Sequence, residues 1–116
     1  MKFGYARIST AKQDLTRQIA SLENAGCDEV FCDIQIGKNM KKAELQKILS
    51  KIWENDTFVV TDIDRIGRNF TEVTELYTKL KDMKVNIAVI NQELLNHNVN
   101  DKKFLQVYAD KQILVL

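Results

Sequence analysis

The chain has 116 residues, of which 45% are hydrophobic and 28% charged, and its net charge is +1 at pH 7. This length and composition predict one soluble globular domain, and the balanced charge does not by itself indicate a nucleic-acid partner. No apolar run approaches the length of about 18 residues that a membrane helix needs, and the charged N-terminus lacks the pattern of a secretory signal peptide.

The first part of the chain is predicted to run as strand, helix, strand and loop. Aromatic and β-branched residues predict a strand over 3–8 and a short strand over 29–33. Gly26 is expected to end the intervening helix, and residues 34–40 are expected to form a loop. That helix is predicted from three apolar residues at helical spacing, Leu15, Ile19 and Leu22.

The central part repeats the alternation. A second helix is predicted from the apolar stripe Leu45, Ile48, Leu49 and Ile52. Asn55 and Asp56 form a turn signal, and residues 57–61 then form the most strand-like segment of the chain. Because this segment is a continuous apolar run, it is expected to be a strand covered on both faces.

The last part continues with a helix, a strand, a loop and a final helix. Asn69 or Thr71 is expected to cap the third helix, and residues 85–90 are predicted to form a fourth strand. Residues 91–100 are rich in asparagine and predict a loop, after which a last helix begins near Asp101. The apolar stripe of the third helix is Phe70, Val73, Leu76, Tyr77 and Leu80, and that of the last helix is Phe104, Val107 and Tyr108.

This alternation predicts an α/β domain: a three-layer sandwich whose mostly parallel central sheet has four to five strands and helices on both faces. Ligands in such sheets bind beyond the carboxyl ends of the strands. Ser9 comes just after the first strand, and residues 64–68 come just after the third. The two segments should therefore meet at one edge of the sheet.

The residues expected at this edge indicate chemistry on a phosphodiester. Arg7 and Ser9 would meet Arg65 and Arg68, and guanidinium groups grip two phosphate oxygens at once. A serine nucleophile needs activation, but the single histidine, His97, lies in a polar loop without an evident carboxylate partner. A serine–histidine–aspartate triad is therefore disfavoured.

Two other patterns leave alternatives open. Asp62 and Asp64 follow the third strand and could hold Mg²⁺, as in phosphatases and nucleases, although this Asp-x-Asp signal is short. Residues 38–51 carry five lysines against one acid, Glu44, and this local excess fits either a phosphate-binding patch or a solvated helix face. The five lysines are Lys38, Lys41, Lys42, Lys47 and Lys51.

Two segments resemble the signatures of the serine recombinases, the resolvase/invertase family. Residues 5–10, Tyr-Ala-Arg-Ile-Ser-Thr, are similar to the opening motif of that family, and residues 64–69, Asp-Arg-Ile-Gly-Arg-Asn, are similar to its second signature. The order and separation of the two motifs also match. Further positions with similar spacing are Gln13, Leu15, Gln18, Asp33, Gly37, Leu45 and the Asn55-Asp56 turn.

The resemblance implies site-specific DNA recombination without a metal or other cofactor. Ser9 would attack a DNA phosphodiester, form a 5′-phosphoserine link and free a 3′-hydroxyl, which religates after strand exchange. The resemblance implies DNA as partner, a homodimer that forms a tetramer in the synaptic complex, and the bacterial cytosol or nucleoid as location. By position, the phosphate would be held by Arg7, Arg65 and Arg68, with Gln13, Gln18, Lys42 and Asp64 in support.

The chain departs from the family pattern in three ways. Lys42 stands where the family usually has an active-site arginine, and Ile36 stands where a small residue precedes the loop glycine. A lysine keeps the charge but loses the bidentate fork, so reduced activity is expected. We also expect a shortened member of the family, with a catalytic domain over 1–100, the start of a dimerisation helix over 101–116 and no DNA-binding domain.

A shortened chain should bind DNA weakly and without site selection, and two other classes of function remain open beside the recombinase. The first is a non-catalytic remnant that pairs with a full-length recombinase and modulates it. The second is the Mg²⁺-dependent phosphatase or nuclease that would use Asp62 and Asp64.

Overall fold

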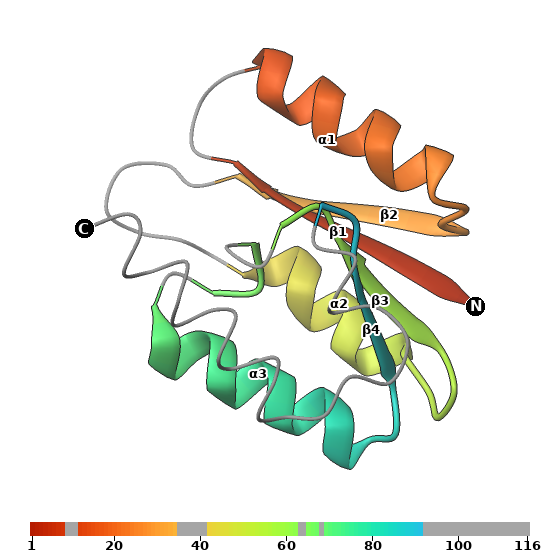
Figure 1. Cartoon of the computed structure of the whole chain (residues 1–116), viewed down its shortest axis with the longest axis vertical. Helices are drawn as coiled ribbons and strands as arrows, with labels where there is room; N and C mark the ends of the chain where they lie inside the picture. Colours follow the sequence, from red (N-terminus) through yellow and green to blue (C-terminus); the bar gives the residue numbers. More distant parts are fainter. Residues whose placement is uncertain (9–11, 35–41, 63–64, 68, 92–116) are drawn as a thin grey trace.

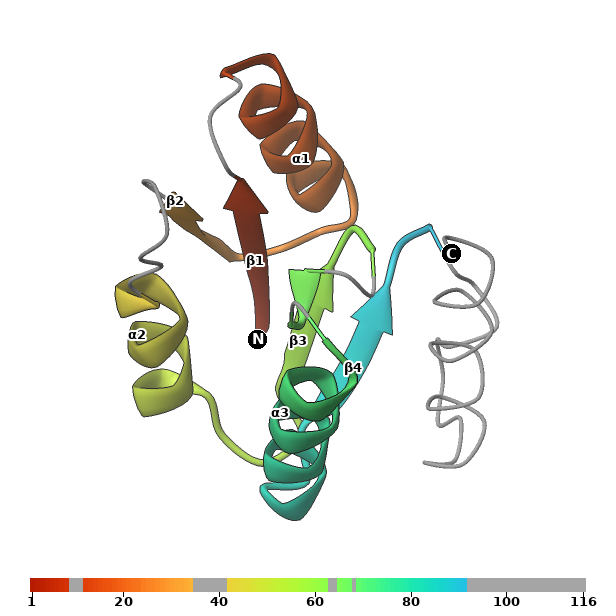
Figure 2. The ribbon, with the colours of Figure 1, turned by 90° about the vertical axis from the view of Figure 1, so that its left-hand side faces the viewer.

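A computed structural model describes residues 1–8, 12–34, 42–62, 65–67 and 69–91. They form a parallel sheet in the order β2-β1-β3-β4, and Figures 1 and 2 show helices on both faces of it. The three-layer α/β sandwich predicted from the sequence is therefore confirmed, with four strands in the part of the chain described. In chain order the elements are β1 (Lys2–Ile8), α1 (Lys12–Asn24), β2 (Glu29–Ile34), α2 (Ala43–Lys51), β3 (Thr57–Val60), α3 (Phe70–Asp82) and β4 (Asn86–Val89).

The larger part of the core lies between the sheet and the helices α2 and α3. Phe58 and Val60 of β3 point into this core, whereas Val59 between them belongs to the opposite face, as the period of a strand requires. The predicted apolar stripes of both helices supply the other wall. Its buried helical members are Leu45, Ile48, Val73, Leu76, Tyr77 and Leu80, and Ile52, just past the end of α2, joins them.

A smaller core lies under α1 on the other face of the sheet. Leu22 of α1 is completely buried there against Ala6 of β1 and Val59 of β3. Gly4 allows the close approach, because a Cβ at this position would lie 3.0 Å from the Cys27 Sγ and 3.2 Å from the Leu22 Cβ. The C-terminal half of α1 is therefore seated closely on the first half of β1.

The amino-terminal edge of the sheet is held together by Asp56, which precedes β3. Its carboxylate accepts one hydrogen bond from the N-terminal ammonium group of Met1, at 3.0 Å, and one from the Trp53 N–H, at 2.8 Å. The Thr57 N–H in turn donates to the Met1 carbonyl. These bonds tie the starts of β1 and β3 together at the edge opposite to the predicted site (Figure 1).

The strand boundaries follow the sequence predictions to within one residue at each end. Gly26 and Asn55 both adopt positive φ angles, of 88° and 73°, which agrees with the predicted helix stop and turn. The loop over 92–100 and the helix expected from Asp101 lie outside the described residues. Within the described part, none of the helices has the length and apolar character that crossing a membrane would require.

Candidate nucleic-acid active site

Three of the predicted site residues meet at the carboxyl end of β1. The backbone carbonyl of Arg7 accepts a hydrogen bond from the Arg65 Nη1 at 2.8 Å and a second one from the Gln18 Nε2 at 3.4 Å. Gln18 comes from α1 and is 5% exposed, while Arg65 follows β3. The two donors therefore join α1 and the segment after β3 to the last residues of β1, the strand that leads to Ser9.

Arg65 is placed by a short turn after β3. Its N–H donates to the Asp62 carbonyl at 3.0 Å, and the next residue, Ile66, is buried in the larger core. An apolar anchor directly beside the arginine keeps the guanidinium at the edge of the sheet. The carboxyl ends of β1 and β3 therefore lie at one edge of the sheet, where Arg65 contacts the Arg7 carbonyl; that the arginine side chains and Ser9 meet on one phosphate stays a prediction.

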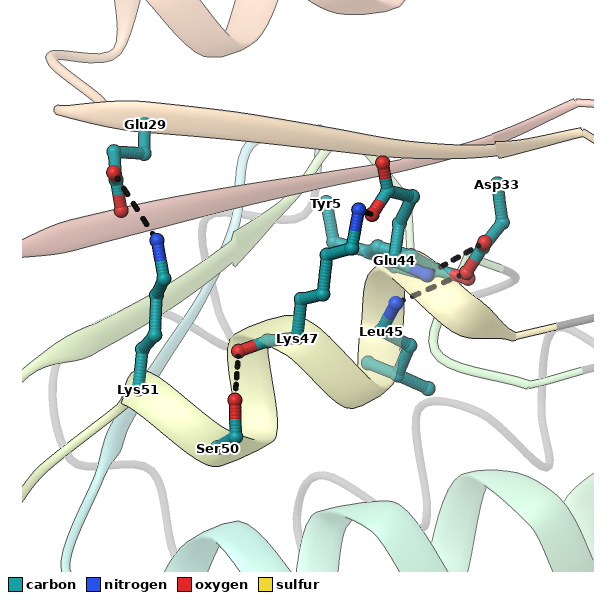
Figure 3. Close-up of polar contacts among 8 residues, drawn as sticks. All are labelled: Tyr5, Glu29, Asp33, Glu44, Leu45, Lys47, Ser50 and Lys51. Carbon is teal, nitrogen blue, oxygen red and sulfur yellow. Dashed lines mark hydrogen bonds and ion pairs between the residues drawn. The ribbon is translucent and has the colours of Figure 1, made fainter.

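A buried carboxylate at the end of β2 organises the start of α2. Asp33 is 3% exposed, and its carboxylate accepts hydrogen bonds from the N–H of Glu44 at 2.9 Å and of Leu45 at 3.1 Å (Figure 3). It also accepts a bond from the Tyr5 hydroxyl at 2.7 Å. Asp33 thus caps a helix whose own N-cap residue, Lys42, makes no side-chain cap.

The Tyr5 hydroxyl stays protonated in this setting. Burial raises the pKa of Tyr5 strongly, and the hydrogen bond to Asp33 and the negative charge of Asp33 raise it further. The phenol therefore serves as a permanent donor to the carboxylate. Tyr5 also stacks on Phe58 with ring centroids 6.0 Å apart, which fixes the ring in the larger core.

Lys42, the predicted substitute for an active-site arginine, lies at the start of α2 and faces α3. Its Nζ is 3.6 Å from the Glu72 Oε1, and both side chains are about one-third exposed, at 33% and 32%. Glu72 belongs to the first turn of α3, where its N–H donates to the Asn69 Oδ1 at 2.9 Å. Of the two caps predicted for this helix, Asn69 is the one observed.

The lysine-rich segment carries less unpaired positive charge than its sequence indicates. Lys47 pairs with Glu44 on the same helix at 2.9 Å, and Lys51 pairs with Glu29 of β2 at 3.7 Å (Figure 3). Glu29 lies outside the segment, as does Glu72, the partner of Lys42, and these two acids offset charges that the sequence alone leaves uncompensated. For these two lysines the pairing favours the solvated helix face over a phosphate-binding patch, while Lys38 and Lys41 lie outside the described residues.

The remaining predicted site residues lie wholly or partly outside the described residues. Ser9, Asp64 and Arg68 lie outside the described residues, and Gln13 is placed only through the backbone of α1. The other acid of the Mg²⁺ alternative, Asp62, accepts a hydrogen bond from the Asn91 side chain at 3.2 Å. Among the described residues, no group of three or more histidine, cysteine or acidic side chains is arranged to hold a metal ion.

Three residues near this edge were not predicted as site residues: Tyr5, Asp33 and Glu72. A lone acid at the end of an apolar strand is the signal that could have identified Asp33, because such a carboxylate is buried only when it is fully hydrogen-bonded. Asn69 and Glu72 have the spacing of a capping box, which marks the start of a helix. That pattern gives no information about the pairing of Glu72 with Lys42, which is thirty residues away.

Comparison with known proteins assigns the chain to a family. The family model of the resolvase N-terminal domain matches residues 2–112. A DNA-invertase from Escherichia phage P1 is 34% identical over 94 residues, covering 81% of this chain and 50% of the relative. The transposon Tn917 resolvase of Enterococcus faecalis is 30% identical over 109 residues, covering 94% and 59%.

The solved structures give the same result. A serine recombinase from Sulfolobus solfataricus superposes with a TM-score of 0.59 at 33% identity, covering 98% of this chain and 79% of that one. The chain spans about half the length of the curated relatives it matches.

Proposed function

Because the chain belongs to the resolvase N-terminal domain family of serine recombinases, we propose that it is the part of a site-specific DNA recombinase that cleaves and rejoins DNA. The convergence of Gln18 and Arg65 on the Arg7 carbonyl is the observation that carries this proposal. It supports a phosphate-binding edge built around Arg7 from three elements: β1, α1 and the segment after β3. The Asp33 cap adds a fourth element, α2, to the same edge.

In the proposed reaction the Ser9 Oγ attacks the phosphorus of a DNA phosphodiester. A bond forms between the serine oxygen and the 5′-phosphate, the bond between phosphorus and the 3′ oxygen breaks, and the proton that Ser9 loses ends on that oxygen as a free 3′-hydroxyl. Arg7, Arg65 and Arg68 neutralise the charge that develops on the non-bridging oxygens. Because the phosphoserine link conserves the energy of the broken bond, a 3′-hydroxyl can reverse the step without a cofactor.

The supporting residues have separate tasks in this proposal. Gln18 and Asp64 orient the arginines, Gln13 orders the segment that carries Ser9, and Lys42 adds a positive charge from α2. DNA is the substrate, and a homodimer that becomes a tetramer during strand exchange is the acting form. Residues 1–100 form the catalytic domain, residues 101–116 begin the dimerisation helix, and the cytoplasm is the place of action.

The test is the formation of a covalent adduct between protein and DNA. The chain is fused to a DNA-binding domain of known target and incubated with a nicked duplex that traps the cleaved state. We expect an adduct that Ser9→Ala abolishes and Ser50→Ala retains. Ser50 is a matched control, because its exposed hydroxyl only donates to the Lys47 carbonyl of its own helix at 2.7 Å.

Three results would contradict the proposal. An adduct that persists in Ser9→Ala would place the nucleophile elsewhere. The absence of any adduct from the fused wild-type chain would favour the non-catalytic module, and cleavage that a chelator abolishes would favour the Mg²⁺-dependent enzyme.

A further inference from the structure

The ion pair between Lys42 and Glu72 joins the first turns of two helices at the carboxyl edge of the sheet. Both α2 and α3 begin at this edge, because each follows a strand of the parallel sheet (Figure 2). The two charged atoms are 3.6 Å apart, which is longer than a hydrogen bond, and solvent reaches both side chains. The pair is therefore a loose electrostatic contact beside the proposed phosphate site.

Both members of the pair are held in place by contacts at the starts of their helices. Lys42 is the N-cap residue of α2 and lies two residues before Glu44, whose N–H, like that of Leu45, donates to the buried Asp33 carboxylate. Glu72 is fixed by the Asn69 cap and by Gly67, since a Cβ on Gly67 would lie only 2.7 Å from the Glu72 Cβ. The proximity of the lysine and the glutamate therefore follows from the helix starts.

A carboxylate at position 72 has opposite effects on folding and on anion binding. A negative charge in the first turn of α3 is favoured by the helix dipole and by the exposed N–H groups there. The same charge cancels the attraction of Lys42 for any phosphate that approaches this edge. A phosphate that binds the lysine must therefore displace the carboxylate from it.

We propose that Glu72 is an intramolecular competitor of the DNA phosphate for Lys42. It thereby sets how strongly Lys42 attracts the substrate. This inference rests on the proposed function, because it takes DNA as the ligand of the edge. Lys42 is a single point charge rather than a bidentate fork, so one carboxylate is enough to occupy it. Glu72 is thus a residue that regulates binding, and it does not contact the reacting atoms.

The test measures binding of the unfused chain to a short labelled duplex by fluorescence anisotropy across a salt titration. We expect Glu72→Gln to raise the affinity by about two- to five-fold, the range that one exposed ion pair represents. The slope of log affinity against log salt should steepen by up to about 0.9, the value for one additional phosphate contact. Glu75→Gln is the matched control, because Glu75 is an exposed acid of the same helix.

The double variant separates competition from general charge effects. In the Lys42→Met background, Glu72→Gln should give no more gain than Glu75→Gln gives. Lys42→Met alone should cost less than two-fold in the wild-type chain, because its charge is already occupied, and about two- to five-fold in the Glu72→Gln background. Thermal unfolding of every variant checks that each one folds.

Equal gains from Glu72→Gln and Glu75→Gln would overturn the inference. So would a gain that persists without Lys42, or a cost of Lys42→Met that is the same in both backgrounds. These results are independent of the covalent adduct. Coupling without a Ser9-dependent adduct would leave the competition standing and contradict only the recombinase, whereas an adduct without coupling would contradict only the competition.

Discussion

Asp33 shows how one side chain determines the position of a whole helix. Its two carboxylate oxygens accept three hydrogen bonds, from the Tyr5 hydroxyl and from the N–H groups of Glu44 and Leu45. All three donors are fixed, because the phenol is packed in the core and the N–H groups belong to the first turn of α2. A buried anion at this point is also stabilised by the helix dipole.

We expect Asp33→Asn to destabilise the fold by about 2–3 kcal/mol, because hydrogen bonds to a charged group are lost. Either orientation of the new amide brings its NH₂ group against one of the two helical N–H groups. Tyr5→Phe removes one bond to the same carboxylate and leaves both helical bonds intact, so it should cost less, about 1.5 kcal/mol, the lower end of the range for a hydrogen bond to a charged group. Urea unfolding gives both values, and equal losses for the two variants would contradict the capping role.

At the scale of elements, the start of α3 depends on the close approach of the preceding turn. Gly67 lies against the first turn of the helix, and a Cβ there would be 2.7 Å from the Glu72 Cβ and 2.8 Å from the Val73 nitrogen. The second of these neighbours is backbone, which cannot rotate away. The turn that carries Arg65 and the helix that carries Glu72 are therefore packed as one unit.

We expect Gly67→Ala to cost about 1–3 kcal/mol, the usual range for overpacking, and to displace the first turn of α3. If this turn moves, the Lys42–Glu72 contact should lengthen, so the variant should also weaken the coupling between these two residues. Urea unfolding measures the first effect, and the affinity change on Glu72→Gln in the Gly67→Ala background measures the second. Wild-type stability in Gly67→Ala would show that the helix start tolerates the extra methyl group.

At the scale of the whole molecule, the elements could be predicted because each has its own local signal. The periods of the apolar residues predicted the strands and helices, and the parallel order predicted that Arg7 and Arg65 share an edge. Contacts between distant residues carry no such signal. Gln18 was identified only through the family resemblance, and the lysine-rich segment gave no indication of its partners Glu29 and Glu72.

The two edges of the sheet have separate roles, and Asp56 allows this separation to be tested. Its hydrogen bond from the Trp53 N–H, and then its contact with the N-terminal ammonium group, lower the pKa of the Asp56 carboxyl below the ordinary value. A carboxyl group with a lowered pKa stabilises the folded state above the unfolded value of about 3.9. That contribution is lost as the pH falls through the lower, folded value.

We therefore expect Asp56→Asn to reduce the urea midpoint at neutral pH, and we expect its difference from the wild type to shrink in acid. Asp82→Asn, which neutralises an exposed acid at the end of α3, should not reduce the midpoint, because a negative charge is unfavourable at the C-terminus of a helix.

DNA affinity at neutral pH should be unchanged by Asp56→Asn, since Asp56 lies at the amino-terminal edge of the sheet and Arg7 and Arg65 lie at the other. A fall in DNA affinity as large as that caused by removing Arg65 would show that the two edges are coupled, and a constant difference from the wild type down to strong acid would show that the Asp56 charge does not stabilise the fold.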